Sequence, residues 1–519
     1  MCGLIVKPSS DIVDGNLISY RGPDSTDTVL VDEYEFIFHR LAVMDVTSLG
    51  NQPFVDDKFV VVCNGEIFNF KQLEAANPYS YKSHSDCEVL LPLLAEYSLF
   101  NACNLLDGEF AFVAMDKKKN TLIAARDPIG IRPLFYGYTQ TGKIAFASEI
   151  KALLSICAKV IPFPPGHYYQ DNKFTPYLEL HTIADSKHNE LPEILNNIRN
   201  LLVSAVVKRL DAEVPVGFLL SGGLDSSLVC AIAKKHTDHP LETFAIGLDY
   251  NPIDLKYAKQ MADYLGSNHH EVIFSRDDIA SVLKTIVWVT ETWDITTIRA
   301  SIPMFLLCKY IKNNSNVKVV LTGEISDELF GYKYTDFAPN ASSFQQESQK
   351  RMRELHMYDV LRADRCISSN GLEARVPFSD KDFISYVMSI NPEIKLNKNN
   401  KGKYLLRQAF AGQNYLPDEI LWREKAAFSD AVGHGMVDCL IEMAEAKYSD
   451  AEFAARVKSY PTNTPASKEA LMYREMFLEM FPNQEHVIAS YWLPNQSWPN
   501  CNLADPSARH LPNYGTSGH

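Results

Sequence analysis

The sequence predicts a protein of two domains, an α+β domain followed by an α/β domain. Strand-like runs separated by Gly, Asp and Pro turns extend from residue 29 to about 150, and after Leu191 such runs alternate with helical ones. The length of 519 residues also exceeds what one core usually holds. The predicted units are residues 2–180 and 191–481, followed by a loosely ordered tail, 482–519, rich in Asn, Pro and Ser.

Composition and charge exclude several classes of protein. The net charge is -14 and no run is rich in Lys or Arg, which argues against a nucleic-acid scaffold. Ten cysteines include no C-x-x-C pair, so the sequence predicts a reduced, cytoplasmic compartment. The start lacks a signal-peptide layout, and no apolar run approaches the roughly 18 residues that span a bilayer. We therefore expect no nucleic-acid or membrane partner. A homodimer is compatible with the sequence, which does not determine the oligomeric state.

The first unit has the pattern of an antiparallel α+β domain. A helix is expected at 86–97, where apolar residues have helical spacing and Asp86 suits the N-cap. A Pro-rich stretch at 161–166 and a polar segment at 181–190 indicate the domain boundary. The predicted strands are TVLV, YEFIFHRLAVMDV, KFVVVC, GEFAFVAMD, TLIAARD and KIAFAS.

Cys2 is a candidate nucleophile. If Met1 is removed, one residue carries both a thiol and a free α-amine. That amine has a pKa near 7.7–8.0, against about 10.4 for lysine, so it can take the proton of the thiol at neutral pH. A cysteine at position 2 alone is more often an ordinary residue, and the neighbouring motifs must decide.

The segments around and after Cys2 in this unit are Met1-Cys2-Gly3, Arg21-Gly22-Pro23-Asp24, His39 to Val43, Asn64 to Asn69, Asp86 and Arg126 to Leu134. Together they resemble the class II glutamine amidotransferase domain. The resemblance implies an N-terminal-nucleophile fold, a sandwich of two antiparallel sheets between helices. Two departures are Tyr20, where the family usually has histidine, and a short segment between Lys7 and Tyr20 that suggests a trimmed first helix.

The same resemblance implies a role for each residue of a glutamine site. Cys2 would attack the carboxamide, while the Asn64 side chain and the Gly65 N–H would hold the oxyanion. Taken singly, Asn64-Gly65 is also a favoured turn pair and Arg40 an ordinary surface charge. The implied glutamine contacts are Arg40 with the α-carboxylate, Asp86 with the α-amine, and Glu66, Leu41 and Val43 lining the pocket.

A glycine-rich loop begins the second unit. The apolar run VPVGFLL leads into Ser221-Gly222-Gly223-Leu224-Asp225-Ser226-Ser227, and a helical pattern follows. Backbone N–H groups at such a junction can cradle phosphate oxygens, although an isolated S-G-G is often only a turn. The loop lacks the lysine of G-x-x-x-x-G-K-[ST], which argues against transfer of a γ-phosphate.

A second, acidic loop runs from Thr322 to Gly331 after another apolar strand. Acidic residues at the carboxyl ends of parallel strands lie where ligands usually bind, and carboxylates with phosphate oxygens suit Mg²⁺. His269-His270 is an adjacent pair without partner ligands at zinc spacing, so we favour structural or phosphate-contacting roles over a metal site.

The two loops resemble those of ATP pyrophosphatases, and the whole chain from 2 to about 481 resembles the asparagine synthetase family. The resemblance implies ATP as a substrate, with Mg²⁺, and glutamine and aspartate as the other substrates. Its most specific later segments are Thr296 to Ser301, Ser368 to Phe378, Arg423-Glu424-Lys425 and Ser467 to Ala470.

By this resemblance each residue of the synthetase site has an implied role. Glu324 would assist ammonia attack and Lys425 would stabilise phosphate charge; Arg299 and Lys425 taken singly are also plausible solvated charges. The implied ATP contacts are Leu219, Ser221, Gly222, Gly223, Asp225, Ser226, Ile246, Thr322 and Gly323; the implied metal ligands are Asp225 and Asp327; and the aspartate candidates are Thr296, Thr297 and Arg299.

Two rival functions remain at this stage. A β-lactam-forming ligase would share the adenylating domain without needing ammonia, and retention of Cys2 with its pocket argues against it. A regulatory protein on an inactive synthetase fold is disfavoured by the retained residues of both sites, Cys2, Asp225, Glu324, Asp327 and Lys425.

Ile325 departs from the family motif Gly-Glu-Gly-Ser-Asp-Glu, and one residue is missing after Gly331. If the usual glycine permits positive φ, isoleucine would be strained; if it only provides space, isoleucine fits at negative φ. Because Glu324 and Asp327 are retained, we predict a negative φ at Ile325, with both carboxylates facing the SGGLDSS loop.

Overall fold

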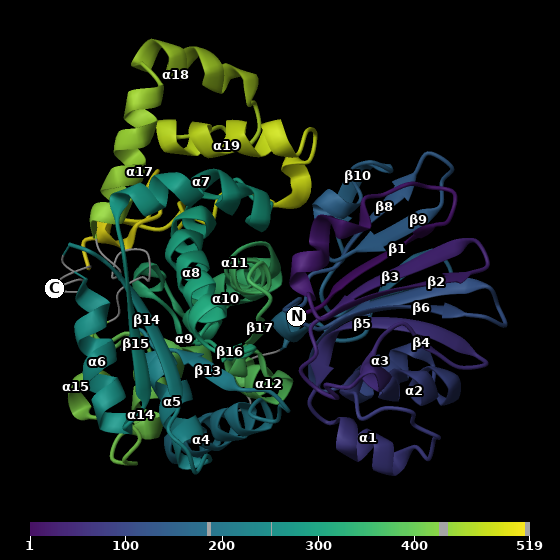
Figure 1. The fold of residues 1–519 in the computed structure, drawn as a ribbon. Helices are drawn as coiled ribbons and strands as arrows, with labels where there is room; N and C mark the ends of the chain where they lie inside the picture. The colour runs from purple at the N-terminus through teal and green to yellow at the C-terminus, as the bar shows by residue number, and fades with distance from the viewer. Residues whose placement is uncertain (184–187, 251, 425–433, 514–519) are drawn as a thin grey trace.

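The computed structural model describes residues 1–183, 188–250, 252–424 and 434–513. Two domains lie side by side, the first purple to blue and the second teal to yellow (Figure 1). The first contains two six-stranded sheets whose pairings are all antiparallel, and the second contains a five-stranded parallel sheet among helices. Both predicted fold classes are confirmed.

One sheet of the first domain carries the amino terminus of the chain. Its strand order is β10-β8-β9-β1-β3-β2, so the first strand lies in the interior of the sheet. A short 3-10 helix, η1 (Gly15–Arg21), stands where a trimmed first helix was expected. The strands are β1 (Gly3–Pro8), β2 (Ser25–Val31), β3 (Tyr34–Arg40), β8 (Phe135–Thr139), β9 (Ile144–Ala147) and β10 (Cys157–Pro162).

The second sheet stacks on the first and is covered on its outer face by short helices. Val60 and Val62 pack into the core between the sheets, whereas Val61 and Cys63 pack under the helices, as strand periodicity requires. The sheet order is β12-β11-β7-β6-β5-β4. The elements are β4 (Phe54–Val55), β5 (Phe59–Ile67), β6 (Gly108–Asp116), β7 (Thr121–Arg126), β11 (His167–Gln170), β12 (Lys173–Pro176), α1 (Phe70–Ala76), α2 (Leu90–Glu96) and α3 (Leu99–Leu105).

The parallel sheet of the second domain has the order β15-β14-β13-β16-β17. The chain builds outward from β13 to β15 and then returns to place β16 and β17 on the other side of β13. Loops after β13 and β16 therefore flank the point where the order reverses, which is where ligands bind in open α/β sheets. The strands are β13 (Val216–Leu219), β14 (Glu242–Leu248), β15 (Asn268–Phe274), β16 (Val319–Leu321) and β17 (Glu373–Arg375).

Helices surround this sheet and form the rest of the domain, with α17, α18 and α19 projecting at the top of Figure 1. Their bounds are α4 (Leu191–Lys208), α5 (Leu224–Lys235), α6 (Ile253–Leu265), α7 (Arg276–Thr290), α8 (Ile295–Asn314), α9 (Ser326–Phe330), α10 (Ala341–Glu354), α11 (Asp359–Ser368), α12 (Lys381–Ser389), α13 (Pro392–Lys395), α14 (Tyr404–Phe410), α15 (Asp418–Leu421), α17 (His434–Lys447), α18 (Asp450–Arg456) and α19 (Lys468–Met480).

Residues 482–513 differ from the loosely ordered tail that their composition suggested. Trp492 packs into the main core, and Trp498, Cys501 and Leu511 form a buried cluster of their own. The prediction weighed the Asn, Pro and Ser content and overlooked these apolar anchors, each of which removes surface from water.

Among the described residues, no helix is both long and apolar enough to cross a membrane.

Candidate active sites

Cys2 lies at the start of β1, partly buried against the loop after β3. Its Sγ is 3.4 Å from the Leu41 backbone nitrogen, which donates to it, and its own backbone N–H donates to Asn64 Oδ1 at 2.9 Å. Burial raises the pKa of the Cys2 thiol to about 11 with Met1 in place. The structure thus brings Cys2, Leu41 and Asn64 into contact, and with its pKa raised the thiol needs a base to become a nucleophile.

The Asn64 amide is a candidate oxyanion donor. Its Nδ2 is buried and has no hydrogen-bond partner among the described residues. An orphaned buried donor is costly unless a ligand satisfies it, so its position beside the thiol suits a transient oxyanion. Gly65 follows on β5, where an added Cβ would lie 2.4 Å from the Glu109 carbonyl oxygen. Glycine at this position lets the neighbouring strand approach.

Two buried carboxylates lie beyond Asn64. Burial raises the pKa of Asp86 to about 6, and burial together with the Asp86 charge raises that of Glu66. Asp86 accepts from the Ile67 N–H at 2.7 Å. Glu66 is 3.2 Å from Arg375 Nη2, a cation supplied by β17 of the other domain. Two such carboxylates suit an ammonium group.

Arg40, the expected contact for an α-carboxylate, is buried with its guanidinium among backbone carbonyls. Nη1 donates to the Thr47 carbonyl at 2.6 Å and to Asn51 Oδ1 at 2.7 Å, and Nη2 donates to the carbonyls of Met44 and Asp45. These contacts fix the loop after β3 that contains Leu41 and Val43.

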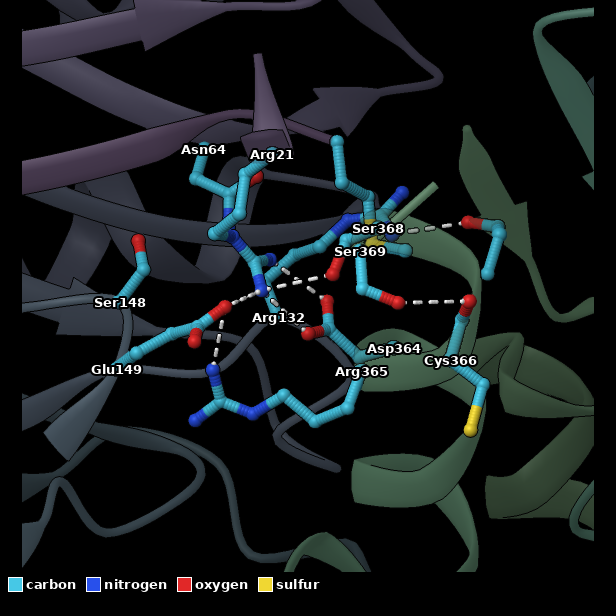
Figure 2. A network of polar contacts seen from close by, with 12 residues as sticks. Arg21, Asn64, Arg132, Ser148, Glu149, Asp364, Arg365, Cys366, Ser368 and Ser369 are labelled. Atoms are coloured by element: carbon cyan, nitrogen blue, oxygen red, sulfur yellow. Dashed lines mark hydrogen bonds and ion pairs between the residues drawn. The ribbon is translucent and has the colours of Figure 1, made fainter. Parts of the chain in front are cut away.

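A buried ion network joins Arg21 of the first domain to α11 of the second (Figure 2). Arg21 donates through Nε to the Cys2 carbonyl at 2.9 Å and pairs with Glu149 and with Asp364 on α11, each at 2.8 Å. Arg365 binds the same Glu149 at 2.7 Å. Although burial opposes it, these cations hold the pKa of Glu149 well below its usual range. Each of these buried charges would be costly without its partners, so the network couples the two domains.

Tyr20, the departure from the family histidine, belongs to this network. Its hydroxyl donates to Glu149 at 2.5 Å and accepts from Lys151 Nζ at 3.1 Å. Burial and the Glu149 charge raise the pKa of Tyr20, so it stays neutral.

The glycine loop and the acidic loop line one cavity of about 230 Å³ in the second domain. Gly222 has φ +69°, and an added Cβ would lie 2.4 Å from the backbone of α6, so only glycine fits. At Gly323, a Cβ would lie 2.9 Å from the Ser226 nitrogen, so glycine there lets the loops approach. The predicted residues that line the cavity are Leu219, Ser221, Gly223, Asp225, Ser226, Ile246, Thr296, Thr322, Gly323, Glu324 and Asp327.

Asp225 and Asp327 face each other across a buried lysine that the sequence analysis missed. Lys403 Nζ lies 2.8 Å from Asp225 Oδ2, 2.5 Å from Asp327 Oδ1 and 3.0 Å from Ser326 Oγ. Lys403 stands in a polar loop, NKNNKGKY, with nothing to mark it among neighbouring lysines. Its burial and its two carboxylate partners identify it only in three dimensions.

The predicted backbone at Ile325 is wrong. Its φ is +81° and ψ -24°, in the left-handed region at the N-cap of α9. The loop thus keeps the conformation that glycine usually permits, at a cost of roughly 1–3 kcal/mol for a non-glycine residue. Burial of the Ile325 side chain, 2% exposed, is worth a similar amount and offsets it. The second half of the prediction is confirmed, since Glu324 and Asp327 line the same cavity as the SGGLDSS loop.

Two further arginines hold cavity walls. Arg362 binds Glu324 at 2.7 Å and Asp359 at 3.0 Å. Arg423 donates to the Gly222 carbonyl at 3.1 Å and so clamps the glycine loop. Arg423 belongs to the Arg423-Glu424-Lys425 motif that the sequence analysis identified, whereas Arg362 belongs to none of its motifs and was missed. Lys425 lies outside the described residues.

Of the three aspartate candidates on α8, only Thr296 lines the cavity. Ala300 and Met304 line it one and two turns further along. Thr297 is buried and bonds the N-cap Asp294. Arg299 turns to Glu469 and Asp505 and does not appear among the cavity-lining residues.

The adjacent histidines lie on the edge strand β15. His269 Nδ1 is 3.0 Å from Thr243 Oγ1, and His270 stacks on Phe244 and lies 3.0 Å from Glu242. These contacts favour the structural role.

A thiol nucleophile with an orphaned amide donor in one domain, and a phosphate-type loop facing carboxylates in the other, define an amidotransferase joined to a nucleotide-dependent synthetase. Comparison agrees on both halves. The glutamine amidotransferase domain model matches residues 1–213, and the asparagine synthase model matches 197–341 and 333–506.

Curated relatives match over nearly the whole chain. A probable glutamine-hydrolysing asparagine synthetase of Schizosaccharomyces pombe is 42% identical, covering 95% of this chain and 94% of its own. The Homo sapiens glutamine-hydrolysing asparagine synthetase is 38% identical, covering 99% of each. The Oryza sativa enzyme 2 is 41% identical, covering 93% of this chain and 86% of its own. The chain belongs to the glutamine-hydrolysing asparagine synthetase family.

Proposed function

We propose that the chain converts aspartate to asparagine, using ATP to activate the side-chain carboxylate and ammonia released from glutamine to form the amide. The observation that carries the proposal is the pairing, in one chain, of the Cys2 site with the cavity between Asp225 and Asp327. Residues 2–180 are assigned to ammonia release and 191–481 to the synthetase reaction. A homodimer and a cytoplasmic location stay predictions of the sequence.

The thiol becomes active once Met1 is removed; in the structure the buried Met1 amine donates to the Leu372 carbonyl at 3.2 Å. The freed α-amine of Cys2 takes the thiol proton, and the sulfur attacks the glutamine carboxamide carbon. Asn64 Nδ2 and the Gly65 N–H hold the oxyanion, and Asp86 and Glu66 hold the α-ammonium. Ammonia leaves with the proton, and water then cleaves the thioester to glutamate.

ATP binds with its adenosine against Leu219, Ile246, Thr322 and Gly323 and its phosphates over the glycine loop. An aspartate side-chain oxygen attacks the α-phosphorus, and pyrophosphate leaves, giving a β-aspartyl adenylate. Lys403 and Lys425 offset negative charge on the leaving group.

Asp225 and Asp327 are the residues that would hold Mg²⁺. They fit because their carboxylates already converge on one cation, Lys403. Within the described ranges no cluster of three or more His, Cys, Asp or Glu side chains suits a metal, so phosphate and water oxygens must complete the shell, as Mg²⁺ prefers. When bound, the ion would neutralise pyrophosphate charge.

The amide forms when ammonia attacks the acyl carbon and AMP leaves. Glu324, oriented by Arg362, accepts a proton from the attacking nitrogen. Unprotonated ammonia must pass between the sites without meeting bulk water. The buried ion network around Arg21, which links Cys2 to the second domain, supports this passage because it holds the two domains together through buried charges.

The test is formation of asparagine and pyrophosphate from aspartate, ATP and glutamine, with each substrate omitted in turn. We expect pyrophosphate to require aspartate and ATP, and asparagine to require a nitrogen source as well. Pyrophosphate release without aspartate, or an amide product that needs no nitrogen source, would contradict the proposal and favour another ligase.

A further inference from the structure

The segment at the carboxyl end of the described chain lies against the synthetase cavity. We call residues 492–513 the C-terminal brace. It touches two walls of the cavity, the beginning of α8 and the turn η6 (Lys333–Phe337) with the preceding Tyr332. Thr296 on α8, and Tyr332 and Tyr334 on the turn, line the cavity itself.

The first contact fixes α8. Arg299 Nη1 and Nη2 donate to the two carboxylate oxygens of Asp505, each at 2.9 Å, while Nε and Nη2 bind Glu469 on α19 at 2.9 and 2.6 Å. The Arg299 side chain is 2% exposed. Although burial opposes it, Arg299 holds the pKa of Asp505 below its usual range, so the pair stays charged. Thr296 donates to the Trp492 carbonyl at 3.0 Å.

The second contact fixes the tyrosine turn. Trp498, Cys501 and Leu511 pack against Tyr332 and Tyr334. The Cys501 thiol donates to the Tyr334 carbonyl at 3.7 Å. Asn513 donates to the Lys333 carbonyl at 2.7 Å, and Lys333 Nζ donates to the Asn513 carbonyl at 3.2 Å.

Arg351 on α10 ties the two contacts together. Its guanidinium lies 4.1 Å from the Tyr334 ring centroid and 4.3 Å from that of Trp492, and Nη2 donates to the Leu493 carbonyl at 2.8 Å. Displacement of the brace would therefore release both walls.

We propose that the C-terminal brace is a positioning element of the aspartate side of the synthetase site, anchored by the Asp505–Arg299 pair. The adenosine side, Leu219 and Ile246, comes from strands β13 and β14 of the sheet and does not depend on this anchor. Thr296, the aspartate candidate that lines the cavity, belongs to a wall that the brace fixes, and this assigns the brace to the aspartate side. Arg299 thus acts through the brace, not by direct contact with aspartate. This inference rests on the proposed function.

The test compares Asp505→Asn, Asp505→Glu and Asp438→Asn in the full chain. Asp438→Asn is the matched control. Asp438 pairs with Arg509 of the brace at 3.0 Å, and its side chain is 53% exposed, so the substitution removes a carboxylate partner of the same segment away from the cavity. Pyrophosphate release is measured with ammonium as the nitrogen source over ranges of aspartate and ATP. Glutaminase kinetics and thermal unfolding are measured on the same preparations.

For Asp505→Asn we expect kcat/KM for aspartate to fall by about 10- to 100-fold, the cost of misplacing a reacting group by about 1 Å. KM for ATP and glutaminase kinetics should change less than twofold, and Asp505→Glu should recover part of the loss. Asp438→Asn should match the unaltered chain. A second variant ending at Leu493 keeps Trp492 in the core and should lose aspartate-dependent pyrophosphate release while keeping glutaminase activity.

Three results would overturn the inference. One is an unchanged kcat/KM for aspartate in Asp505→Asn. Another is a parallel loss of glutaminase activity and melting temperature, which would indicate general destabilisation. The third is a lower KM for aspartate, which would mean that Asp505 competes with the substrate. Absence of aspartate-dependent pyrophosphate release from the unaltered chain would instead contradict the proposed function itself.

Discussion

Replacement of Lys403 by methionine isolates the charge that holds the two cavity loops together. The change keeps an unbranched, slightly shorter side chain and removes the ammonium that lies between Asp225 and Asp327, at 2.8 and 2.5 Å. The Lys403 side chain is 1% exposed. Removing one partner of a buried ion pair costs about 3–5 kcal/mol, because the other charge is left desolvated. Since the Asp327 side chain is 30% exposed, water relieves part of that cost, and we expect about 3 kcal/mol.

The substitution should also slow the synthetase reaction itself. Loss of one preorganised donor that stabilises charge in the transition state costs about 10²–10³ in kcat. Ammonium-dependent pyrophosphate release should therefore fall by that factor, while glutaminase activity persists because Cys2 lies in the other domain. If the carboxylates hold Mg²⁺, added Mg²⁺ should restore part of the lost free energy of unfolding. Lys398→Met, at an exposed pair with Glu393, is the matched control. A Lys403→Met enzyme that releases pyrophosphate within twofold of the unaltered rate would refute this reasoning.

Three further predictions concern the two sites. Because burial raises the folded pKa of Asp86 to about 6, ionisation of this carboxyl destabilises the wild-type fold as pH rises from about 4 to 6, and Asp86→Asn should abolish that part of the pH dependence. Thermal unfolding over this pH range checks the prediction, and a profile equal to that of the wild type would count against it. Asp225→Asn and Asp327→Asn should each abolish pyrophosphate release and largely spare glutaminase activity; normal adenylation by either would exclude that residue as an essential metal ligand. Arg375→Met should raise KM for glutamine, and that effect should vanish in a Glu66→Gln background; additive effects would mean that Arg375 does not act through Glu66.

The fold class and most candidate site residues could be predicted from the sequence because the patterns that indicate them are local. Strand runs with turn punctuation, the VPVGFLL strand entering SGGLDSS, and the acidic loop after β16 each depend on neighbouring residues. Their convergence follows from the strand order of a parallel sheet, which brings the ends of β13 and β16 together.

What the sequence did not provide are contacts between distant segments. Lys403 reaches Asp225 across 178 residues, and Arg299 reaches Asp505 across 206, with no local pattern at either end. The prediction at Ile325 was wrong for a different reason. It rested on the retention of Glu324 and Asp327, which favoured an unstrained loop with negative φ, whereas the loop and the α9 N-cap impose the left-handed conformation and burial offsets the strain.

Cys2→Ala tests the central claim, that one chain holds two separable sites joined by ammonia. The variant removes only the thiol, so the account predicts loss of glutaminase activity and of glutamine-dependent asparagine formation, with ammonium-dependent formation kept within about twofold. Asparagine formed from each nitrogen source is measured on the folded variant, with thermal unfolding as the check on structure. Comparable loss with glutamine and with ammonium in a folded protein would contradict the two-site account.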